Sequence, residues 1–95
     1  NKDGCNALHI ASEKGYLDIV KLLIENGIDI NKQNNNGYIS LHYASRDGHL
    51  DIVKLLIEKG ANFRQVNNEG KIPLDVACNE EIKQFLLSKQ FPSLI

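Results

Sequence analysis

Three residues at a fixed interval are the ones whose chemistry suggests a metal or catalytic site. His9, His42 and Asp75 are separated by 33 residues each, since 42 minus 9 and 75 minus 42 are both 33. In stacked repeats, equivalent side chains lie on successive layers about 10 Å apart, whereas zinc ligands converge to about 2 Å from one ion. We therefore expect His9 and His42 to hydrogen-bond to neighbouring loop backbone, and His49, alone in a turn, to be structural too.

The cysteines do not indicate a catalytic centre either. Cys5 and Cys78 should lie about two repeat spacings apart, and a disulfide needs Cα atoms within about 7 Å. Cys5 on a loop is a candidate reactive thiol, but the only basic residue near it in sequence is Lys2. The chain contains no nucleophile motif and no phosphate-binding glycine loop. The sequence therefore predicts two reduced thiols, no enzyme activity, no metal and no cofactor.

A duplication explains the interval between the histidines. Residues 4–29 align with residues 37–62 without a gap, and 16 of the 26 aligned positions are identical. A fixed period of roughly 20 to 50 residues indicates a stacked array, in which each unit covers the apolar face of its neighbour. The functional question therefore concerns a surface and not a pocket.

Charge and hydropathy exclude several classes of partner. The chain has 95 residues with 11 basic and 12 acidic side chains, a net charge of −1, which provides no field for binding nucleic acid. The longest apolar run, residues 22–24, is far shorter than the roughly 20 residues of a membrane-spanning helix, and no signal peptide pattern opens the chain. With reduced thiols, this composition predicts an intracellular protein, cytoplasmic or nuclear, without membrane insertion. We expect a monomer.

Each repeat is predicted to contain a loop, a short helix, a turn and a longer helix. Polar residues before Gly4, Gly37 and Gly70 are typical of hairpin-like turns with a positive φ angle. Glycines also follow the expected helices, as is common at helix ends. The helices are expected at residues 7–14, 17–26, 40–47 and 50–59.

Two segments in phase with each other carry a family resemblance. Residues 4–11 read Gly-Cys-Asn-Ala-Leu-His-Ile-Ala and residues 37–44 read Gly-Tyr-Ile-Ser-Leu-His-Tyr-Ala. Both resemble the ankyrin repeat signature G-x-T-P-L-H-x-A, and residues 15–20 and 27–31 resemble the start of the family's second helix and its exit. The resemblance implies an all-α repeat solenoid of three stacked helix-turn-helix repeats, and it covers nearly the whole chain.

The positions at which the chain differs from the ankyrin signature bear on helix capping and on where the array ends. Asn6-Ala7 and Ile39-Ser40 replace Thr-Pro, so we expect two first helices to lack the capping hydroxyl, at a cost of about 1 kcal/mol each. In the third unit three residues of the turn between helices are missing, and Lys83 replaces Val20 and Val53. A polar residue there is typical of a terminal capping repeat. The domains are then repeat 1 (1–33), repeat 2 (34–66), a shortened capping repeat 3 (67–90) and a tail (91–95).

The two ends of the chain raise separate expectations. The first repeat has no polar replacement comparable to Lys83, so we expect more sequence upstream of Asn1, including further repeats. The tail, residues 91–95, is expected to pack on the last helix, since Phe91 and Leu94 would otherwise be exposed. The alternatives are that the tail is a short ligand for another domain or is foreign to the protein.

Positions that differ between the repeats predict the partner-binding surface. Positions that repeat are those every layer needs for stacking, and the differing positions cluster on the loops and at the ends of the first helices, where the ankyrin resemblance places partner contacts. Tyr38 is the expected anchor, because tyrosine and arginine are enriched in interface hot spots and Tyr38 lies on the central loop, with Arg46 on the central first helix. The alternative is that this surface is simply unconstrained. The remaining candidates are expected to form the polar surround of this anchor: Glu13, Lys14, Asn36, Asp47, Val66, Glu69 and Lys71.

The leading functional hypothesis is a non-catalytic module that binds a protein or peptide in the concave groove of loop tips and first helices. An alternative is a regulatory or targeting segment of a larger enzyme or channel whose catalytic part lies outside this chain, and a third is self-assembly through the first repeat. Asn31 resembles the loop asparagine that asparaginyl hydroxylases modify in some ankyrin arrays. The more conservative interpretation is that Asn31 hydrogen-bonds to backbone.

Overall fold

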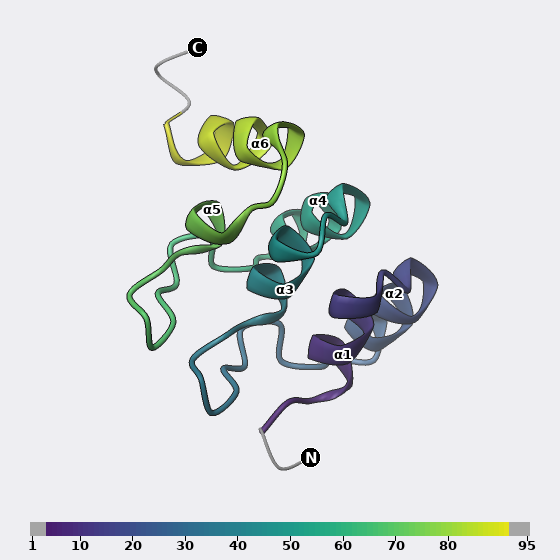
Figure 1. Ribbon diagram of the computed structural model, residues 1–95. Coiled ribbons are helices and arrows are strands. Elements are labelled where there is room, and N and C mark those ends of the chain that lie inside the picture. Colours follow the sequence, from purple (N-terminus) through teal and green to yellow (C-terminus); the bar gives the residue numbers. More distant parts are fainter. Residues whose placement is uncertain (1–3, 92–95) are drawn as a thin grey trace.

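The chain forms an all-helical array of stacked helix pairs, which confirms the predicted fold class (Figure 1). The computed structural model describes residues 4–91. In this part of the chain the secondary structure is helical, without β-strands. The helices are α1 (Ala7–Lys14), α2 (Leu17–Glu25), α3 (Ser40–Arg46), α4 (Leu50–Glu58), α5 (Pro73–Val76) and α6 (Glu80–Gln90).

The helices form two layers. The first helices α1, α3 and α5 pack side by side, and the second helices α2, α4 and α6 form the layer behind them. The loops between α2 and α3 and between α4 and α5 project beyond the first helices (Figure 1). Ala11 and Ala44 are buried, and their small side chains permit the close packing of α1 against α3. The loops and the first helices therefore share one side of the molecule.

The helices of the first two repeats start where the sequence predicts and three of them end slightly earlier. The residues directly after α2, α3 and α4 are Asn26, Asp47 and Lys59, which the sequence predicts to be helical. Gly15 ends α1 with φ of 81°, in the left-handed region that favours glycine. A side chain at Gly15 would also meet His49, because an added Cβ would lie 2.6 Å from its ring.

The expectation that α1 lacks an N-terminal cap is wrong. The side-chain oxygen of Asn6 accepts a hydrogen bond from the backbone N–H of His9 at 3.0 Å, and the backbone N–H of Asn6 donates to Nδ1 of His9 at 2.8 Å. An amide oxygen thus replaces the threonine hydroxyl, as asparagine commonly does at this position. In α3, Ile39 has no such oxygen, although its backbone N–H still donates to Nδ1 of His42.

The third helix pair is shorter, but the predicted place of the missing residues is wrong, because the turn between α5 and α6 has three residues, as many as the turn between α3 and α4, and it is the first helix that is shortened. The helix α5 has only four residues, and Ala77, Cys78 and Asn79 connect it to α6. Asn79 caps α6 by accepting from the backbone N–H of Ile82 at 2.9 Å. Lys83 is exposed, whereas Val53 at the equivalent position is completely buried. The outer side of this pair therefore carries a charge where the internal repeat has an apolar side chain.

The predicted packing of the tail is wrong for its first residue. Phe91 follows α6 and is 46% exposed. Leu94 and the rest of the tail, residues 92–95, lie outside the described residues. None of the described helices has the length and apolar character needed to cross a membrane.

Candidate interaction surface

Two loop asparagines shape the turns that present the candidate residues. Asn34 accepts hydrogen bonds at its side-chain oxygen from the backbone N–H groups of Asn36 and Tyr38, at 2.9 and 3.0 Å. Asn67 does the same for Glu69 and Lys71 in the next loop. Both asparagines are buried. Each loop tip is therefore built on a buried asparagine, which leaves the side chains around it outside.

Tyr38 and Arg46 lie close to each other, and a third residue, Tyr43, joins them. The Arg46 guanidinium carbon is 4.9 Å from the centre of the Tyr43 ring and 5.9 Å from that of Tyr38. The two tyrosine ring centres are 5.1 Å apart. A guanidinium over aromatic faces at these distances is a cation–π arrangement, worth about 0.5–1 kcal/mol when exposed. We call Tyr38, Tyr43 and Arg46 the aromatic–arginine cluster.

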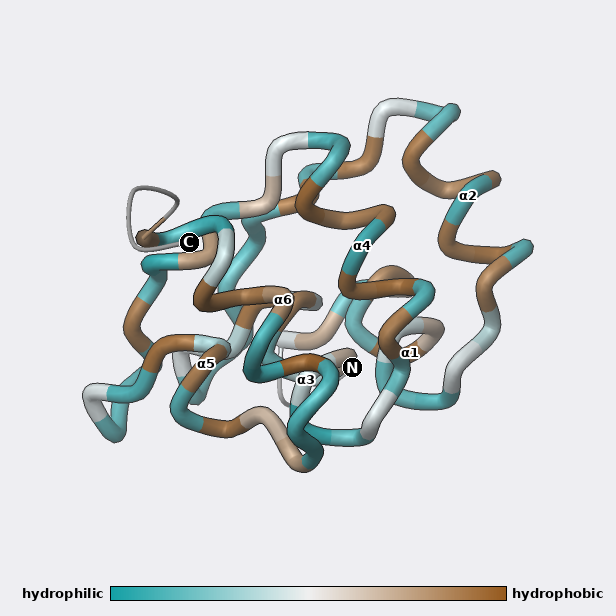
Figure 2. Tube along the Cα trace, turned by 90° about the horizontal axis from the view of Figure 1, so that it is seen from above, coloured by the Kyte–Doolittle hydropathy of each residue, from teal (hydrophilic) through white to brown (hydrophobic). Residues whose placement is uncertain are grey.

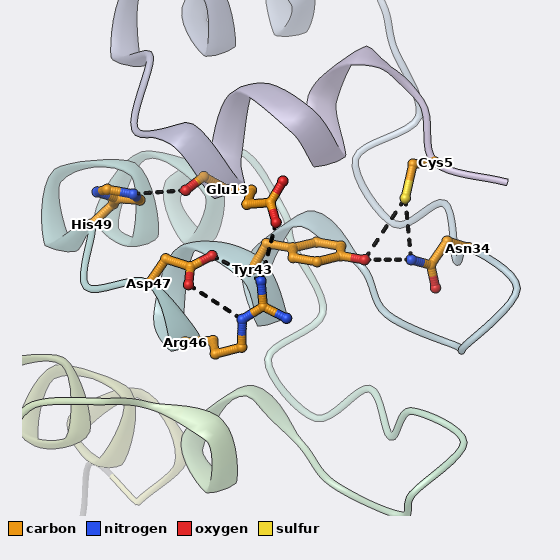
Figure 3. A network of polar contacts seen from close by, with 7 residues as sticks. All are labelled: Cys5, Glu13, Asn34, Tyr43, Arg46, Asp47 and His49. Carbon is orange, nitrogen blue, oxygen red and sulfur yellow. Dashed lines mark hydrogen bonds and ion pairs between the residues drawn. The ribbon is translucent and has the colours of Figure 1, made fainter. Parts of the chain in front are cut away.

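Two carboxylates surround the guanidinium of Arg46. Its Nη2 is 3.3 Å from Oε2 of Glu13 and 3.1 Å from Oδ2 of Asp47 (Figure 3). The hydrogen bond to Asp47 and the charges of Asp47 and Glu13 raise the pKa of Arg46. Such exposed ion pairs contribute only about 0.2–1 kcal/mol to stability. Their main effect is to fix the direction of the Arg46 side chain, and they link the ends of α1 and α3.

Sequence reasoning missed the role of Tyr43. Its hydroxyl accepts from Nδ2 of Asn34 at 2.6 Å and lies 3.7 Å from Sγ of Cys5 (Figure 3). Burial, followed by the contact with Cys5, raises the pKa of Tyr43 to about 12. Tyr43 thus belongs to the aromatic–arginine cluster and also joins the loop to α3. The signal was present, because Tyr43 differs from Ile10 at the same repeat position.

A second group of candidates lies at the loop tips. The Tyr38 hydroxyl donates to Oε1 of Glu69 at 3.4 Å. Asn36, Tyr38, Asn68 and Glu69 line a small hollow between neighbouring loops. The loops are also joined directly, since the backbone N–H of Asn68 donates to the carbonyl of Asn36 at 3.0 Å. Tyr38 therefore connects the aromatic–arginine cluster to the tip of the next loop.

The remaining candidate residues, Lys14, Val66 and Lys71, are exposed. Lys14 lies in the last turn of α1, and Val66 and Lys71 lie in the loop before α5. The carbonyl of Val66 accepts from Nε2 of Gln33 at 3.4 Å. The side chains of Lys14 and Lys71 add positive charge beside Glu13 and Glu69.

The histidines at the fixed interval bond to loop backbone, as expected. Nε2 of His9 lies 2.7 Å from the carbonyl of Lys32, and Nε2 of His42 lies 3.0 Å from that of Lys71. Because Nδ1 of each ring accepts from a backbone N–H, the neutral form with a proton on Nε2 satisfies both partners. Burial lowers the pKa of both histidines. The helices α1 and α3 therefore each hold the loop that leads from their repeat to the next one.

The other candidate chemical residues also have structural contacts. His49 is hydrogen-bonded through Nε2 to the carbonyl of Glu13 at 2.9 Å, and the Asp75 carboxylate accepts from the backbone N–H of Ile72 at 3.1 Å. Cys5 and Cys78 form no disulfide with each other. Among residues 4–91, no three His, Cys, Asp or Glu side chains are grouped so that they could hold a metal ion.

Asn31 also bonds to backbone, as the more conservative interpretation expected. Its side-chain oxygen accepts from the backbone N–H of Asn62 at 2.7 Å, and its Nδ2 donates to the carbonyl of Gly60 at 3.3 Å. The residue is exposed. Its modification stays a prediction, which the mass of the Asn31 peptide from protein purified from its native host would test.

This geometry defines a stacked helix-turn-helix repeat protein whose loop tips and first helices display the side chains that differ between repeats. A family model described as "Ankyrin repeats (3 copies)" matches residues 1–34 and 8–93. The chain belongs to the ankyrin repeat family. Members of this family generally act by binding other proteins.

Among curated proteins, the chain is similar to regulatory subunits of a phosphatase. Protein phosphatase 1 regulatory subunit 12A of Homo sapiens and that of Mus musculus are each 46% identical over 37 residues. Protein phosphatase 1 regulatory subunit 12B of Homo sapiens is 42% identical over 37 residues. Each match covers 39% of this chain and 4% of the relative. The similarity therefore extends over about one repeat.

Proposed function

We propose that this chain binds a protein or peptide, without catalysis, through the side formed by its loop tips and first helices. We call this side the recognition surface. The observation that carries the proposal is the aromatic–arginine cluster on the central repeat. Its members come from α3 and the loop before it, and its neighbours come from α1 and the next loop. The recognition surface consists of Glu13, Lys14, Asn36, Tyr38, Tyr43, Arg46, Asp47, Val66, Glu69 and Lys71.

The cluster has the composition of a binding hot spot. Tyrosine and arginine offer a large contact area with few degrees of freedom, and they carry much of the binding energy in protein interfaces. Here Arg46 is held by Glu13 and Asp47, so little conformational entropy remains to be lost on binding. A preordered arginine beside a partly exposed tyrosine therefore favours the recognition surface over a merely unconstrained one.

The charges favour a protein over a polyanion. Glu13, Asp47 and Glu69 are interspersed with Lys14, Arg46 and Lys71, so the recognition surface carries both signs in equal number. Binding to a nucleic acid depends on an excess of positive charge. A partner with mixed charges and an apolar or aromatic side chain to place against Tyr38 fits this surface.

A second candidate function is regulation of an enzyme located outside this chain. The similar proteins are named as regulatory subunits of a phosphatase, and this chain matches 4% of their length. In this role the recognition surface would position or inhibit a catalytic domain. The two functions use the same residues and differ in the nature of the partner.

Affinity purification tests the proposal. The double variant Tyr38→Ala with Arg46→Ala should lose proteins that the unchanged chain retains from an extract, while its unfolding temperature changes little. The matched control is Lys21→Ala with Glu25→Ala, which removes two exposed side chains from α2, in the other layer. Equal retention by all three proteins would contradict the proposal, and a catalytic subunit among the proteins lost would favour the second function.

A further inference from the structure

Two grooves run between neighbouring helices of the second layer. One lies between α2 and α4 and the other between α4 and α6, and Figure 2 shows α4 between the other two helices. The α2–α4 groove is lined by Lys21, Ile24, Glu25, Leu55, Glu58 and Lys59. The α4–α6 groove is lined by Lys54, Ile57, Glu58, Phe85 and Lys89. Both grooves therefore belong to the second helices, in the other layer from the first helices of the recognition surface.

The two grooves occupy equivalent places in the array. Positions in α2 and α4 correspond at a spacing of 33 residues, and positions in α4 and α6 at a spacing of 30, the difference between Val53 and Lys83. Each groove accordingly has a lysine from its first helix and a lysine at the end of its second helix or directly after it. The α4–α6 groove can therefore be compared with the α2–α4 groove position by position.

Two substitutions distinguish the α4–α6 groove. Phe85 stands at the position of Leu55, and Ser88 stands at the position of Glu58 in the α2–α4 groove. The α2–α4 groove has two lysines and two carboxylates, whereas the α4–α6 groove has two lysines and one carboxylate. Stacking of the second helices does not require a ring at this position, because α2 packs on α4 with a leucine there. The substitutions therefore change the surface chemistry of the groove.

The two lysines of the α4–α6 groove approach one aromatic ring. Nζ of Lys54 lies 5.7 Å from the centre of the Phe85 ring, and Nζ of Lys89 lies 5.3 Å from it. Phe85 and Lys89 are four residues apart in α6 and share one face of the helix, whereas Lys54 reaches the ring from α4. The two ammonium groups are thus no more than about 11 Å apart, the sum of the two distances.

These ammonium groups have no ionic partner within residues 4–91. Neither Lys54 nor Lys89 forms an ion pair there, and both side chains are exposed. The carboxylate of the groove belongs to Glu58, whose Oε1 lies 3.9 Å from Nζ of Lys59, outside the groove lining. Phe85 is partly buried. The α4–α6 groove therefore combines apolar surface with two positive charges that a ligand can neutralise.

We propose that the α4–α6 groove binds an acidic peptide segment in which an apolar side chain lies between two carboxylates. The carboxylates pair with Lys54 and Lys89, and the apolar side chain packs on Phe85 and Ile57. Charge-assisted hydrogen bonds between ammonium and carboxylate groups are stronger than those between neutral groups. This site lies outside the recognition surface, and the proposal does not depend on the function proposed for that surface.

The charges around the groove favour a short peptide over an extended anionic surface. The helices α2, α4 and α6 each carry two acidic residues, and together they carry only four lysines. A nucleic acid or an anionic membrane would lie across several of these carboxylates, and binding to either depends on an excess of positive charge. A short segment needs to contact only the two lysines and the ring between them.

NMR titration of the 95-residue chain with a short peptide tests the proposal. The probe is Glu-Gly-Leu-Gly-Glu, acetylated and amidated, and Gln-Gly-Leu-Gly-Gln is its uncharged control. Alternate side chains of an extended peptide point to the same side, so both glutamates and the leucine can face the groove. Amide shifts should concentrate on α4 and α6, and the control should bind at least about tenfold more weakly. Added salt should weaken the binding of the probe.

Paired variants separate the groove from general charge attraction. Lys54→Ala with Lys89→Ala should weaken binding at least about tenfold, whereas Lys21→Ala with Lys83→Ala should change it less than about twofold. Both pairs remove two exposed lysines from the second layer, and Lys21 and Lys83 do not line the α4–α6 groove. Circular dichroism checks that each variant is folded.

A second pair of variants tests the two distinguishing substitutions. Phe85→Leu with Ser88→Glu gives the α4–α6 groove the residues of the α2–α4 groove and should also weaken binding. Tyr38→Ala with Arg46→Ala should leave the affinity for the probe unchanged, because these residues lie on the recognition surface. Loss of extract proteins by this last variant together with unchanged probe binding would separate the two sites.

Four results would overturn the proposal. One is the absence of saturable shifts at about 5 mM probe, and another is an equal loss of binding in both lysine pairs. The third is binding of the chain to vesicles of phosphatidylserine and phosphatidylcholine that Lys54→Ala with Lys89→Ala abolishes, because a membrane would then be the occupant. The fourth is a dimer in sedimentation velocity that the same variant abolishes, because a second copy would then occupy the groove.

Discussion

The side chain of Asn31 bonds to the backbone of the next repeat through both of its polar atoms. Its oxygen accepts from the N–H of Asn62 at 2.7 Å, and its Nδ2 donates to the carbonyl of Gly60 at 3.3 Å. An intramolecular hydrogen bond contributes about 0.5–1.5 kcal/mol net. Asn31 therefore joins the exit of one repeat to the exit of the next.

Asn31→Ala should lower the free energy of unfolding by about 1–2 kcal/mol, since both bonds are lost and the groups left behind are accessible to water. The measurement is chemical denaturation followed by circular dichroism. Lys32→Ala is the control, because Lys32 is the next residue in the chain and is exposed. A change within about 0.5 kcal/mol is expected for the control. Equal effects of both variants would contradict the bridging role of Asn31.

Stability should decrease as the pH falls below about 6.5. Burial lowers the pKa of His9 and His42 below the ordinary value for histidine, about 6.5, so the unfolded chain binds protons that the folded chain does not. The stability from the neutral histidines is fully present above 6.5 and is lost as the pH falls from there towards their lowered pKa values. The measurement is the free energy of unfolding between about pH 7.5 and 5, above the range where carboxylates titrate.

The variant His42→Asn should be less stable at pH 7.5 and should also show a weaker dependence on pH over the same range. Asparagine cannot take up a proton, so the contribution of His42 to the slope is removed. An unchanged slope in this variant would assign the pH dependence to other groups.

Gly15→Ala should destabilise the chain more than Gly27→Ala. Both glycines have a positive φ, 81° and 83°, so each substitution meets a similar backbone strain of about 1–2 kcal/mol. Only at Gly15 would the added Cβ also meet a neighbour, lying 2.6 Å from the ring of His49, whereas nothing lies within 4 Å of the Cβ added at Gly27. Thermal unfolding of both variants measures the difference.

The contact with His49 can be isolated in a second background. When His49→Ala is present, the additional cost of Gly15→Ala should fall to the level of Gly27→Ala, because the ring is gone. A cost that stays high in that background would show that the backbone at Gly15, and not the ring, is responsible.

Tyr43→Phe should cost about 0.5–1.5 kcal/mol, because it removes the hydroxyl that Nδ2 of the buried Asn34 contacts at 2.6 Å, while this Nδ2 keeps its contact with Sγ of Cys5 at 3.3 Å. Tyr38→Phe removes an exposed bond to Glu69 of 3.4 Å and should change stability by less than about 0.5 kcal/mol. Chemical denaturation distinguishes the two. If Tyr38→Phe proved the more damaging, the roles assigned to the tyrosines would be reversed.

Much of the fold could be predicted because the sequence repeats. Positions such as Leu8 and Leu41 recur since every layer needs them, and both are completely buried. The cap formed by Asn6 was missed because the comparison was made with a threonine hydroxyl, although an amide oxygen can accept the same hydrogen bond. Helix ends were misplaced by one residue, since the last turn depends on local hydrogen bonds that residue types alone do not determine.

The candidate surface could be predicted only in part. Differences between repeats indicated Tyr38 and Arg46, and the structure places them within 5.9 Å of each other, measured from guanidinium carbon to ring centre. Tyr43 was overlooked because residues that differ can support a surface as well as contact a partner. Whether a side chain points outwards or towards Asn34 depends on the packing of loop on helix, which only the three-dimensional structure provides.

The unequal burial of Val53 and Lys83 also bears on how a duplicated sequence diverges. Immediately after a duplication, two copies of a helix encode the same residues, yet a polar substitution is harmless in the copy that lies at an edge and damaging in the copy that lies inside. Selection therefore acts on a position in the array and not on the motif. Adding or losing a terminal repeat would change which substitutions in its neighbour are tolerated, without altering a single residue of that neighbour.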